Sequence, residues 1–199
     1  MIIIFFLQLL FGLHASNNNN AKSILKRWAV DSNSSLNIEG RSNVSAFYCE
    51  VTKYLEADTL QYVNNETTRQ FVFTNSSLSV DINDFDCHQR IITSDFRKTL
   101  KADQNRFLKI HFISVDAFDV RNHNQVVKGK VEILLAGQIK CTTIDFKINA
   151  TSTGLIQMNG SKNMLFSEFN VAPPHKLAGI IRIKEEIKVN FQLFFKPVA

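Results

Sequence analysis

Residues 187–196 read IKVNFQLFFK, and this stretch decides the fold class. Apolar side chains stand at every second position from Ile187 to Phe195, and polar side chains stand between them from Lys188 to Gln192. A period of two is typical of a β-strand with one buried face and one face in water. The stretch therefore predicts a long antiparallel strand.

The same alternation occurs in earlier segments of the chain. It is found at residues 36–38, 47–51, 78–82, 108–112, 131–135 and 144–148. Many short antiparallel strands must close into a barrel or stack as a sandwich, because otherwise their edges stay unpaired. The residues alone predict an all-β domain and leave both arrangements open. A barrel of about eight strands would be wide enough to hold one small ligand.

Two regions depart from the alternation. Residues 88–104 have an apolar spacing that fits a short helix, with Ser94 or Asp95 as its cap. Residues 167–176 contain two consecutive prolines, which exclude a central strand and indicate a loop with one helical turn. No linker, internal repeat or shift in composition divides the chain, so a single domain is expected.

The N-terminus predicts export to the periplasm or secretion. Residues 2–13 form an apolar stretch without a charged side chain, and the small residues Ala15 and Ser16 follow it. This is the layout of a signal peptide, whereas a membrane anchor would need about 20 apolar residues. We expect a signal peptide at residues 1–15, a flexible tail at residues 16–26 and one barrel domain at residues 27–199.

The composition narrows the function classes. Seventeen Phe stand against one Trp and three Tyr, and Phe suits either a thick core or a lipid-lined cavity because it is bulky and has no polar group. The formal net charge of +5 allows weak contact with an anionic membrane surface. Lys and Arg are scattered along the chain, so nucleic acid binding is not expected.

Three cysteines lie in the part of the chain expected to be exported, at positions 49, 87 and 141. In an oxidising compartment two of them should pair and one should remain unpaired. Spacing alone does not choose the pair.

No motif indicates catalysis, a metal site or a resident cofactor. The sequence has no GxSxG elbow for a nucleophile and no Gly-rich loop for a phosphate. Four histidines stand far apart and in no ligand spacing: His88, His111, His123 and His175. We therefore expect a protein that is not an enzyme and that binds no metal or cofactor.

Five segments, taken in order, resemble the YceI-like family, especially its Bacteroidetes members. They are residues 34–49 (SSLNIEGRSNVSAFYC), 78–87 (LSVDINDFDC), 95–103 (DFRKTLKAD), 128–142 (KGKVEILLAGQIKCT) and 169–191 (FNVAPPHKLAGIIRIKEEIKVNF). The resemblance covers nearly all of the chain from Trp28 onward. It departs from the family pattern at residues 103–107 and at Glu168 and Asn170, in loops near the helix, so the resemblance implies the barrel and does not extend to contacts with a ligand head group.

The resemblance implies a lipocalin-like up-and-down β-barrel with one short helical insertion, which settles the choice between barrel and sandwich. It implies a periplasmic protein whose cavity holds a polyisoprenoid or a quinone-like chain. It also implies a disulfide between Cys49 and Cys87. Cys141 would then be an unpaired thiol, for which buried packing is the default role.

Three functions are consistent with these expectations. The first is a carrier or store of a long apolar lipid, the second is a lipocalin-like isomerase or cyclase acting on such a lipid, and the third is a filled barrel that serves as an interaction module. The oligomeric state is left open, and a dimer is one alternative. If the alternation sets which side chains point inward, the cavity that holds the lipid would be lined by Leu108, Ile110, Phe112, Phe146, Ile148, Val189, Phe191 and Leu193.

Overall fold

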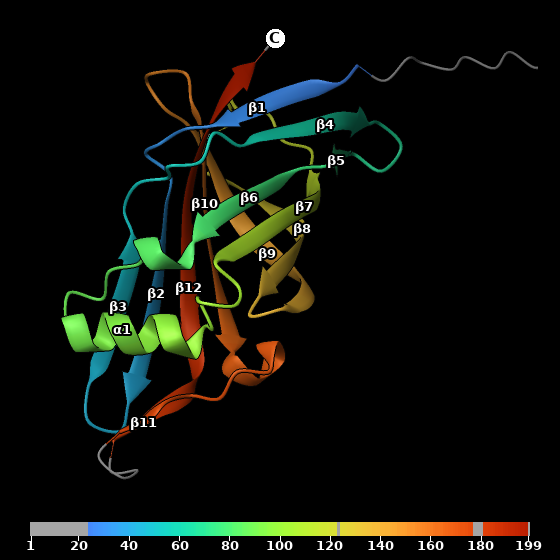
Figure 1. Ribbon diagram of the computed structural model, residues 1–199. Helices are drawn as coiled ribbons and strands as arrows, with labels where there is room; N and C mark the ends of the chain where they lie inside the picture. Colours follow the sequence, from blue (N-terminus) through green and yellow to red (C-terminus); the bar gives the residue numbers. More distant parts are fainter. Residues whose placement is uncertain (1–23, 123, 177–180, 199) are drawn as a thin grey trace, which may run out of the picture.

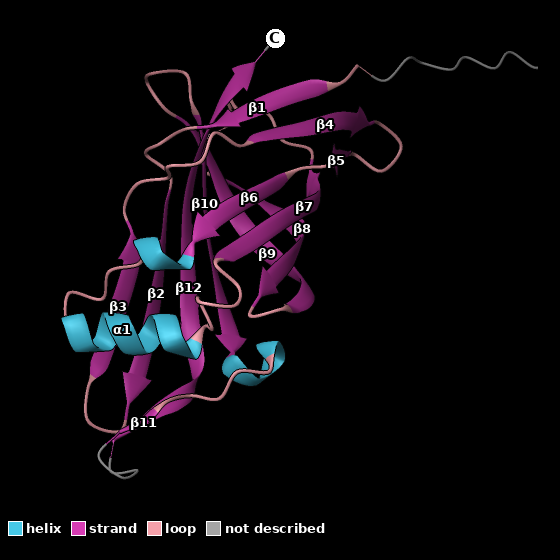
Figure 2. Cartoon of the chain, viewed as in Figure 1, coloured by secondary structure: helices cyan, strands magenta, loops and turns pink. Residues whose placement is uncertain are grey.

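The structure is a computed structural model that describes residues 24–122, 124–176 and 181–198. The predicted signal peptide and most of the predicted tail lie outside these residues. Within them the chain is mainly antiparallel β-structure, with one α-helix and two short 3-10 helices (Figure 2). None of the helices in the described ranges is long and apolar enough to cross a bilayer.

The elements follow one another along the chain as labelled in Figure 1. The strands are β1 (Lys26–Val30), β2 (Ser35–Ser42), β3 (Ala46–Val51), β4 (Thr59–Asn65), β5 (Gln70–Thr74), β6 (Ser77–Asp81), β7 (Phe107–Asp116), β8 (Gln125–Leu135), β9 (Gln138–Ala150), β10 (Ile156–Leu165), β11 (His175–Lys176) and β12 (Ile181–Val198). The helices are η1 (Ile82–Asp84), α1 (Arg90–Thr99) and η2 (Phe166–Phe169).

Eight strands close into a ring, in the order β1, β4, β5, β7, β8, β9, β10 and β12. The ring closes because β1 pairs with β4 on one side and with β12 on the other, so that Trp28 stands opposite both Leu60 and Pro197. All of these pairings are antiparallel. A closed ring leaves no free strand edge, which a sandwich would have. The predicted barrel is confirmed.

The end of the barrel that carries α1 is drawn at the bottom of Figure 1 and is called the lower end below. Toward this end two strands of the wall change their pairing partners. There β12 pairs with β2 instead of β1, and β2 pairs with β3. On the far side of the seam, β7 pairs with β6 instead of β5. Among the described residues no strand ladder joins β3 to β6, so the lower end has a seam between these two strands.

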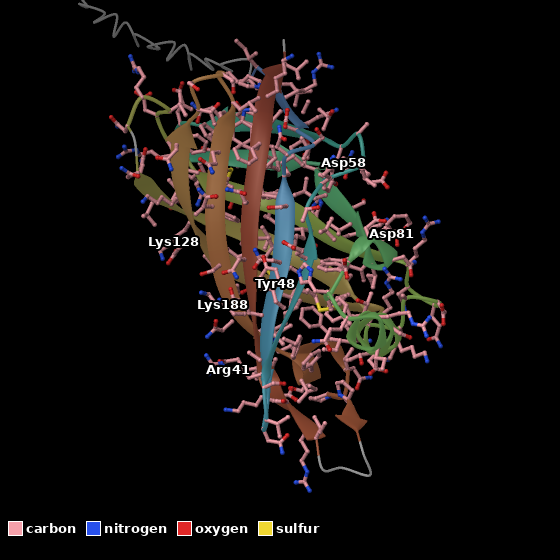
Figure 3. All side chains as sticks on the ribbon, turned by 90° about the vertical axis from the view of Figure 1, so that its left-hand side faces the viewer. Arg41, Tyr48, Asp58, Asp81, Lys128 and Lys188 are labelled. Carbon is pink, nitrogen blue, oxygen red and sulfur yellow. A yellow bond between two sulfur atoms is a disulfide. The ribbon has the colours of Figure 1, made fainter. Side chains whose placement is uncertain are left out.

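A disulfide and a single backbone bridge close this seam. Cys49 of β3 is bonded to Cys87, as predicted. Next to it, Glu50 and Asp86 exchange two backbone hydrogen bonds with N···O distances of 2.9 Å. Figure 3 shows the disulfide beside α1. The covalent bond therefore replaces the ladder that a complete barrel would have at this place.

Helix α1 covers the lower end of the barrel. It begins at Arg90, so the prediction of Ser94 or Asp95 as its cap is wrong; Gln89 precedes the helix and makes no side-chain capping bond. The start is set by the segment of the disulfide, because the backbone N–H of Cys87 donates to Oγ1 of Thr93 at 3.0 Å. This bond between residues six apart takes the place of a side-chain cap at Gln89.

The alternation read from the sequence sets which side chains point inward. On β9 it buries Phe146 and turns Cys141 outward, so the free thiol is exposed and its expected buried role is wrong. The ring of Phe146 lies against two glycines of neighbouring strands. A Cβ at Gly129 or Gly160 would come within 2.7 Å of this ring. Only glycine leaves the space that the ring fills.

Candidate functional site

The eight predicted lining side chains all point into the barrel. They come from β7, β9 and β12, and each of them is buried. Leu108 and Val189 lie toward the lower end, whereas Ile148 and Leu193 lie toward the other end. The alternation thus identified inward-facing positions. Contact of these side chains with a lipid stays a prediction.

The upper half of the interior is filled with aromatic rings. Trp28 packs against Tyr62 and Phe195, with ring centroids 4.5 and 5.6 Å apart. Phe112 stands 6.4 Å from the ring centroids of both Phe146 and Phe195. Offset and tilted rings at these distances attract one another beyond the gain from burial alone. In this half of the barrel the Phe side chains, which are in excess in the composition, pack against one another.

The lower half of the interior is mainly aliphatic. Its side chains surround a void of about 30 Å³: Ile38, Phe96, Leu100, Leu108, Ile110, Ile133, Leu135, Met164, Phe169, Ile187, Val189 and Phe191. A second void of about 10 Å³ lies beside Tyr54 and Leu193. Ligand pockets usually have about 300–1,000 Å³. The interior is therefore packed in this conformation, and a lipid chain requires it to open.

A larger apolar groove lies outside the barrel wall at the lower end. Its volume is about 430 Å³, within the range of ligand pockets. It is formed by the turn between β2 and β3, one face of α1 and the start of β12, together with Phe166 of η2 and Pro174. Its side chains are mostly apolar, and they include Phe47, Ile92, Phe96 and Ile183.

The sequence reasoning missed this groove because its residues come from segments far apart in the chain. One local signal was present, since Ile92 and Phe96 are spaced four residues apart and lie on one helical face. A second signal was Gly40. A Cβ at this position would lie 2.1 Å from the ring of Phe47, so glycine is needed for that ring to lie across β2 and line the groove.

Phe96 separates the groove from the interior. It is buried, and it lines both the groove and the 30 Å³ void. Its ring packs on Phe85 with a centroid distance of 5.2 Å. Phe166 lines the groove without lining the void. Movement of Phe96 would therefore join the outside groove to the aliphatic half of the barrel.

One cluster of polar groups next to the interior is bonded within itself. The Tyr54 hydroxyl donates to the Asp58 carboxylate, and the backbone N–H of Ser79 donates to Tyr54 Oη at 2.7 Å and to Asp58 Oδ2 at 2.8 Å. Burial raises the pKa of Tyr54, and the bond to Asp58 raises it further. The Tyr54 hydroxyl therefore stays protonated and hydrogen-bonded to Asp58. A proton transfer to a lipid in the barrel would first have to break this cluster.

Metal ligands do not gather within the described part of the chain: no three His, Cys, Asp or Glu side chains there are placed to hold an ion. His88, next to the disulfide, binds Glu50 through Nε2 and Oε1 at 3.1 Å. It also stacks on Tyr48, with ring centroids 6.0 Å apart. His111 is hydrogen-bonded to Ser77. His123 lies outside the described residues.

One ion pair at the edge of the seam predicts a pH dependence. Asp81 ends β6 and accepts from the Asn83 N–H at 2.9 Å and from Arg106 Nε at 2.6 Å. Burial raises the pKa of Asp81, but these hydrogen bonds and the charge of Arg106 outweigh it and hold the pKa below its usual value. The pair therefore stabilises the fold above about pH 4, the unfolded-state pKa, and this contribution is lost as the pH falls through the lower folded-state pKa.

We expect Asp81→Asn to be less stable than the unchanged protein at pH 7 and closer to it in stability at pH 3. Urea unfolding at both pH values measures this. Asp119→Asn is a suitable comparison, because its partner Arg121 lies two residues away and both are in a loop. A constant difference in stability between Asp81→Asn and the unchanged protein from pH 7 to pH 3 would contradict the assignment.

Comparisons with known proteins show the fold. No protein-family model matches the chain, and no curated protein is significantly similar to it in sequence. A polyisoprenoid binding domain from Saccharophagus degradans, implicated in plant cell wall breakdown, is similar in structure, with a TM-score of 0.59 and 13% identity over 85% of this chain and 97% of that domain. BcnA of Burkholderia cenocepacia has a TM-score of 0.54 and 12% identity over 81% of this chain and 95% of its own.

A third solved structure has the same fold. The YceI protein of Campylobacter jejuni has a TM-score of 0.51 and 13% identity, over 70% of this chain and 80% of its own. The YceI-like barrel predicted from the sequence is therefore confirmed as the fold of this chain. At these identities the likeness is one of architecture.

Proposed function

We propose that this chain, which has the fold of the YceI proteins, is an exported binding protein that holds a long apolar lipid such as a polyisoprenoid. The observation that carries the proposal is the route at the lower end: an apolar groove of about 430 Å³ leads past Phe96 to an aliphatic barrel interior. The polyisoprenoid-binding domain with the same fold supports this class of ligand. The Cys49–Cys87 disulfide supports an oxidising compartment and thus export.

The binding energy would come from excluding water. Burial of apolar surface contributes about 25 cal/mol per Å², so a chain that buries about 300 Å² would contribute about 7.5 kcal/mol. The groove can take the first part of such a chain without rearrangement. The rest requires Phe96 and α1 to move, because the interior void holds only about 30 Å³. Binding in the barrel is therefore coupled to displacement of the helix.

Extraction of the purified protein with organic solvent, followed by mass spectrometry, tests the proposal. We expect an isoprenoid or another long apolar lipid in amounts comparable to the protein. If nothing is recovered and an added fluorescent isoprenoid does not bind, the proposal is wrong. Formation of a changed lipid product would instead favour the isomerase or cyclase, which we do not propose because Tyr54 is neutral and engaged.

A substitution of Phe96 tests whether lipid passes from the groove into the barrel. Phe96→Leu removes part of the ring that separates the groove from the void, so we expect uptake of a fluorescent isoprenoid to become several-fold faster. Phe166→Leu is the matched control, because Phe166 is equally buried but lines only the groove. Stopped-flow fluorescence measures both rates. Equal rates in the two variants would show that lipid does not pass Phe96.

The packed interior favours one other function. Voids of 10 and 30 Å³ are too small for any drug-sized ligand, as in a barrel that is filled by its own side chains. Such a protein would act through its surface as an interaction module. The absence of both a co-purified lipid and lipid uptake would support this second function over the first.

A further inference from the structure

Two exposed apolar side chains stand beside the groove at the lower end of the barrel. Val44, in the turn between β2 and β3, is 64% exposed, and Ile91, in the first turn of α1, is 73% exposed. Single exposed apolar residues are ordinary on a soluble protein. These two line one continuous apolar groove, together with the half-buried Phe47 and Ile183.

The turn that carries Val44 has its backbone N–H groups bonded within the protein. The Ser42 hydroxyl oxygen accepts from the N–H of Val44 at 3.1 Å and from the N–H of Ser45 at 2.9 Å. The Ser42 N–H in turn donates to the Ser45 carbonyl at 2.7 Å. Backbone groups that are already paired lower the cost of placing a segment in an apolar medium. The turn can therefore enter an apolar medium at a lower cost than a turn with unpaired N–H groups.

Positive charge surrounds these apolar side chains. Exposed cations at this end include Arg41, Arg90, Arg182 and Lys184. In Figure 3, Arg41 points outward at the lower end of β2. Two acidic residues of the same segments are exposed, Glu186 and Glu39, and Glu39 accepts from Asn190 Nδ2 at 2.7 Å; Asp95 is half-buried in the groove, and Glu185 accepts from the Ser167 N–H at 2.5 Å. Cations outnumber carboxylates in these segments. The rim is therefore positive.

We infer that the lower end of the barrel docks on the surface of an anionic lipid bilayer, with Val44 and Ile91 entering the interface. Apolar side chains flanked by cations fit such a surface, because the former enter the acyl boundary and the latter meet the anionic head groups. The inference rests on the proposed function in one respect. A long apolar lipid is too insoluble to diffuse through water, and docking would open the groove toward the membrane that contains it.

Sedimentation with lipid vesicles tests the inference. We expect the purified protein to bind vesicles of phosphatidylcholine mixed with phosphatidylglycerol, to bind pure phosphatidylcholine weakly, and to lose binding as the salt concentration rises. Arg41→Gln and Lys184→Gln should each weaken binding about fivefold. Equal binding to both kinds of vesicle would overturn the inference.

A matched pair of variants locates the surface. Val44→Glu should weaken vesicle binding at least tenfold, because it replaces an inserted apolar side chain with an anion. Val126→Glu is the control: Val126 is 65% exposed, at the start of β8 near the opposite end of the barrel. Equal losses in the two variants would overturn the placement. A dimer that Val44→Glu dissociates would assign this end to a second copy of the chain instead.

A vesicle-free measurement separates this inference from the proposed function. A short, water-soluble fluorescent isoprenoid should bind Arg41→Gln as well as it binds the unchanged protein, because Arg41 does not line the groove. If the probe binds but the vesicles do not, the docking inference is wrong and the lipid-binding function stands. If the anionic vesicles bind but the probe does not, docking stands without that function.

Discussion

Replacing both Cys49 and Cys87 with alanine is expected to lower the free energy of unfolding by about 4 kcal/mol. The bond closes a loop with a sequence separation of 38, and in the chain-entropy model a loop of this length restricts the unfolded chain by about that amount. The folded state loses its covalent closure as well, because the Glu50–Asp86 bridge and the contacts of His88 with Glu50 and Tyr48 then join the two sides of the seam without it.

Urea unfolding of the double variant and of the unchanged protein, with and without reductant, measures this effect. Cys141→Ser is the control, since that thiol is free and exposed and its loss should leave stability nearly unchanged. Reduction should weaken the unchanged protein and leave the double alanine variant as it was. A double variant within about 1 kcal/mol of the unchanged protein would show that the seam closes without the bond.

Replacing Phe112 with alanine is expected to cost about 3–5 kcal/mol, the range for a large buried aromatic side chain. Phe112 sits where the rings of the upper half meet, with its centroid 5.5 Å from that of Phe73 and 6.4 Å from that of Phe195. The cavity would be surrounded by the closed part of the ring, where the strand ladder limits collapse of the wall.

The matched control for this variant is Phe194→Ala. Phe194 belongs to the same barrel but points outward on β12 and is only partly buried, so its loss should cost about 1 kcal/mol. Denaturant unfolding of both variants gives the two values. Equal costs would mean that the interior relaxes around Phe112, as a loosely packed lipid cavity would do and a filled one would not.

The inward-facing side chains, the groove and the start of α1 could be predicted from the sequence to different degrees. Which side chains point inward could be read from the period of two, because a strand turns successive side chains to opposite faces regardless of its partners. That rule correctly placed Phe112 and Phe191 inside. It also places Cys141 outside, because Cys141 differs in parity from the buried Ile144 and Phe146, although buried packing had been the expectation.

The groove and the start of α1 could not be read in this way. Residue Phe47 meets Ile92 and Ile183 only because β12 changes its partner from β1 to β2 partway along its length. The helix begins at Arg90 because a contact between Cys87 and Thr93 fixes it there, where local capping residues are missing. The groove therefore depends on which distant segments meet, whereas the start of α1 depends on a hydrogen bond between residues six apart, which no capping residue announces.

The sequence by itself determined the antiparallel strands of residues 187–196 and their counterparts, and the face of each strand that is buried. Those properties follow from local alternation and from the removal of apolar surface from water. Only the tertiary structure decided that the ring closes through β1, that the disulfide implied by the family resemblance lies at a seam of the wall, and that the interior is packed while a groove stays open beside it. Strand pairing and ring packing join residues far apart in the chain, and no local pattern records which of them meet.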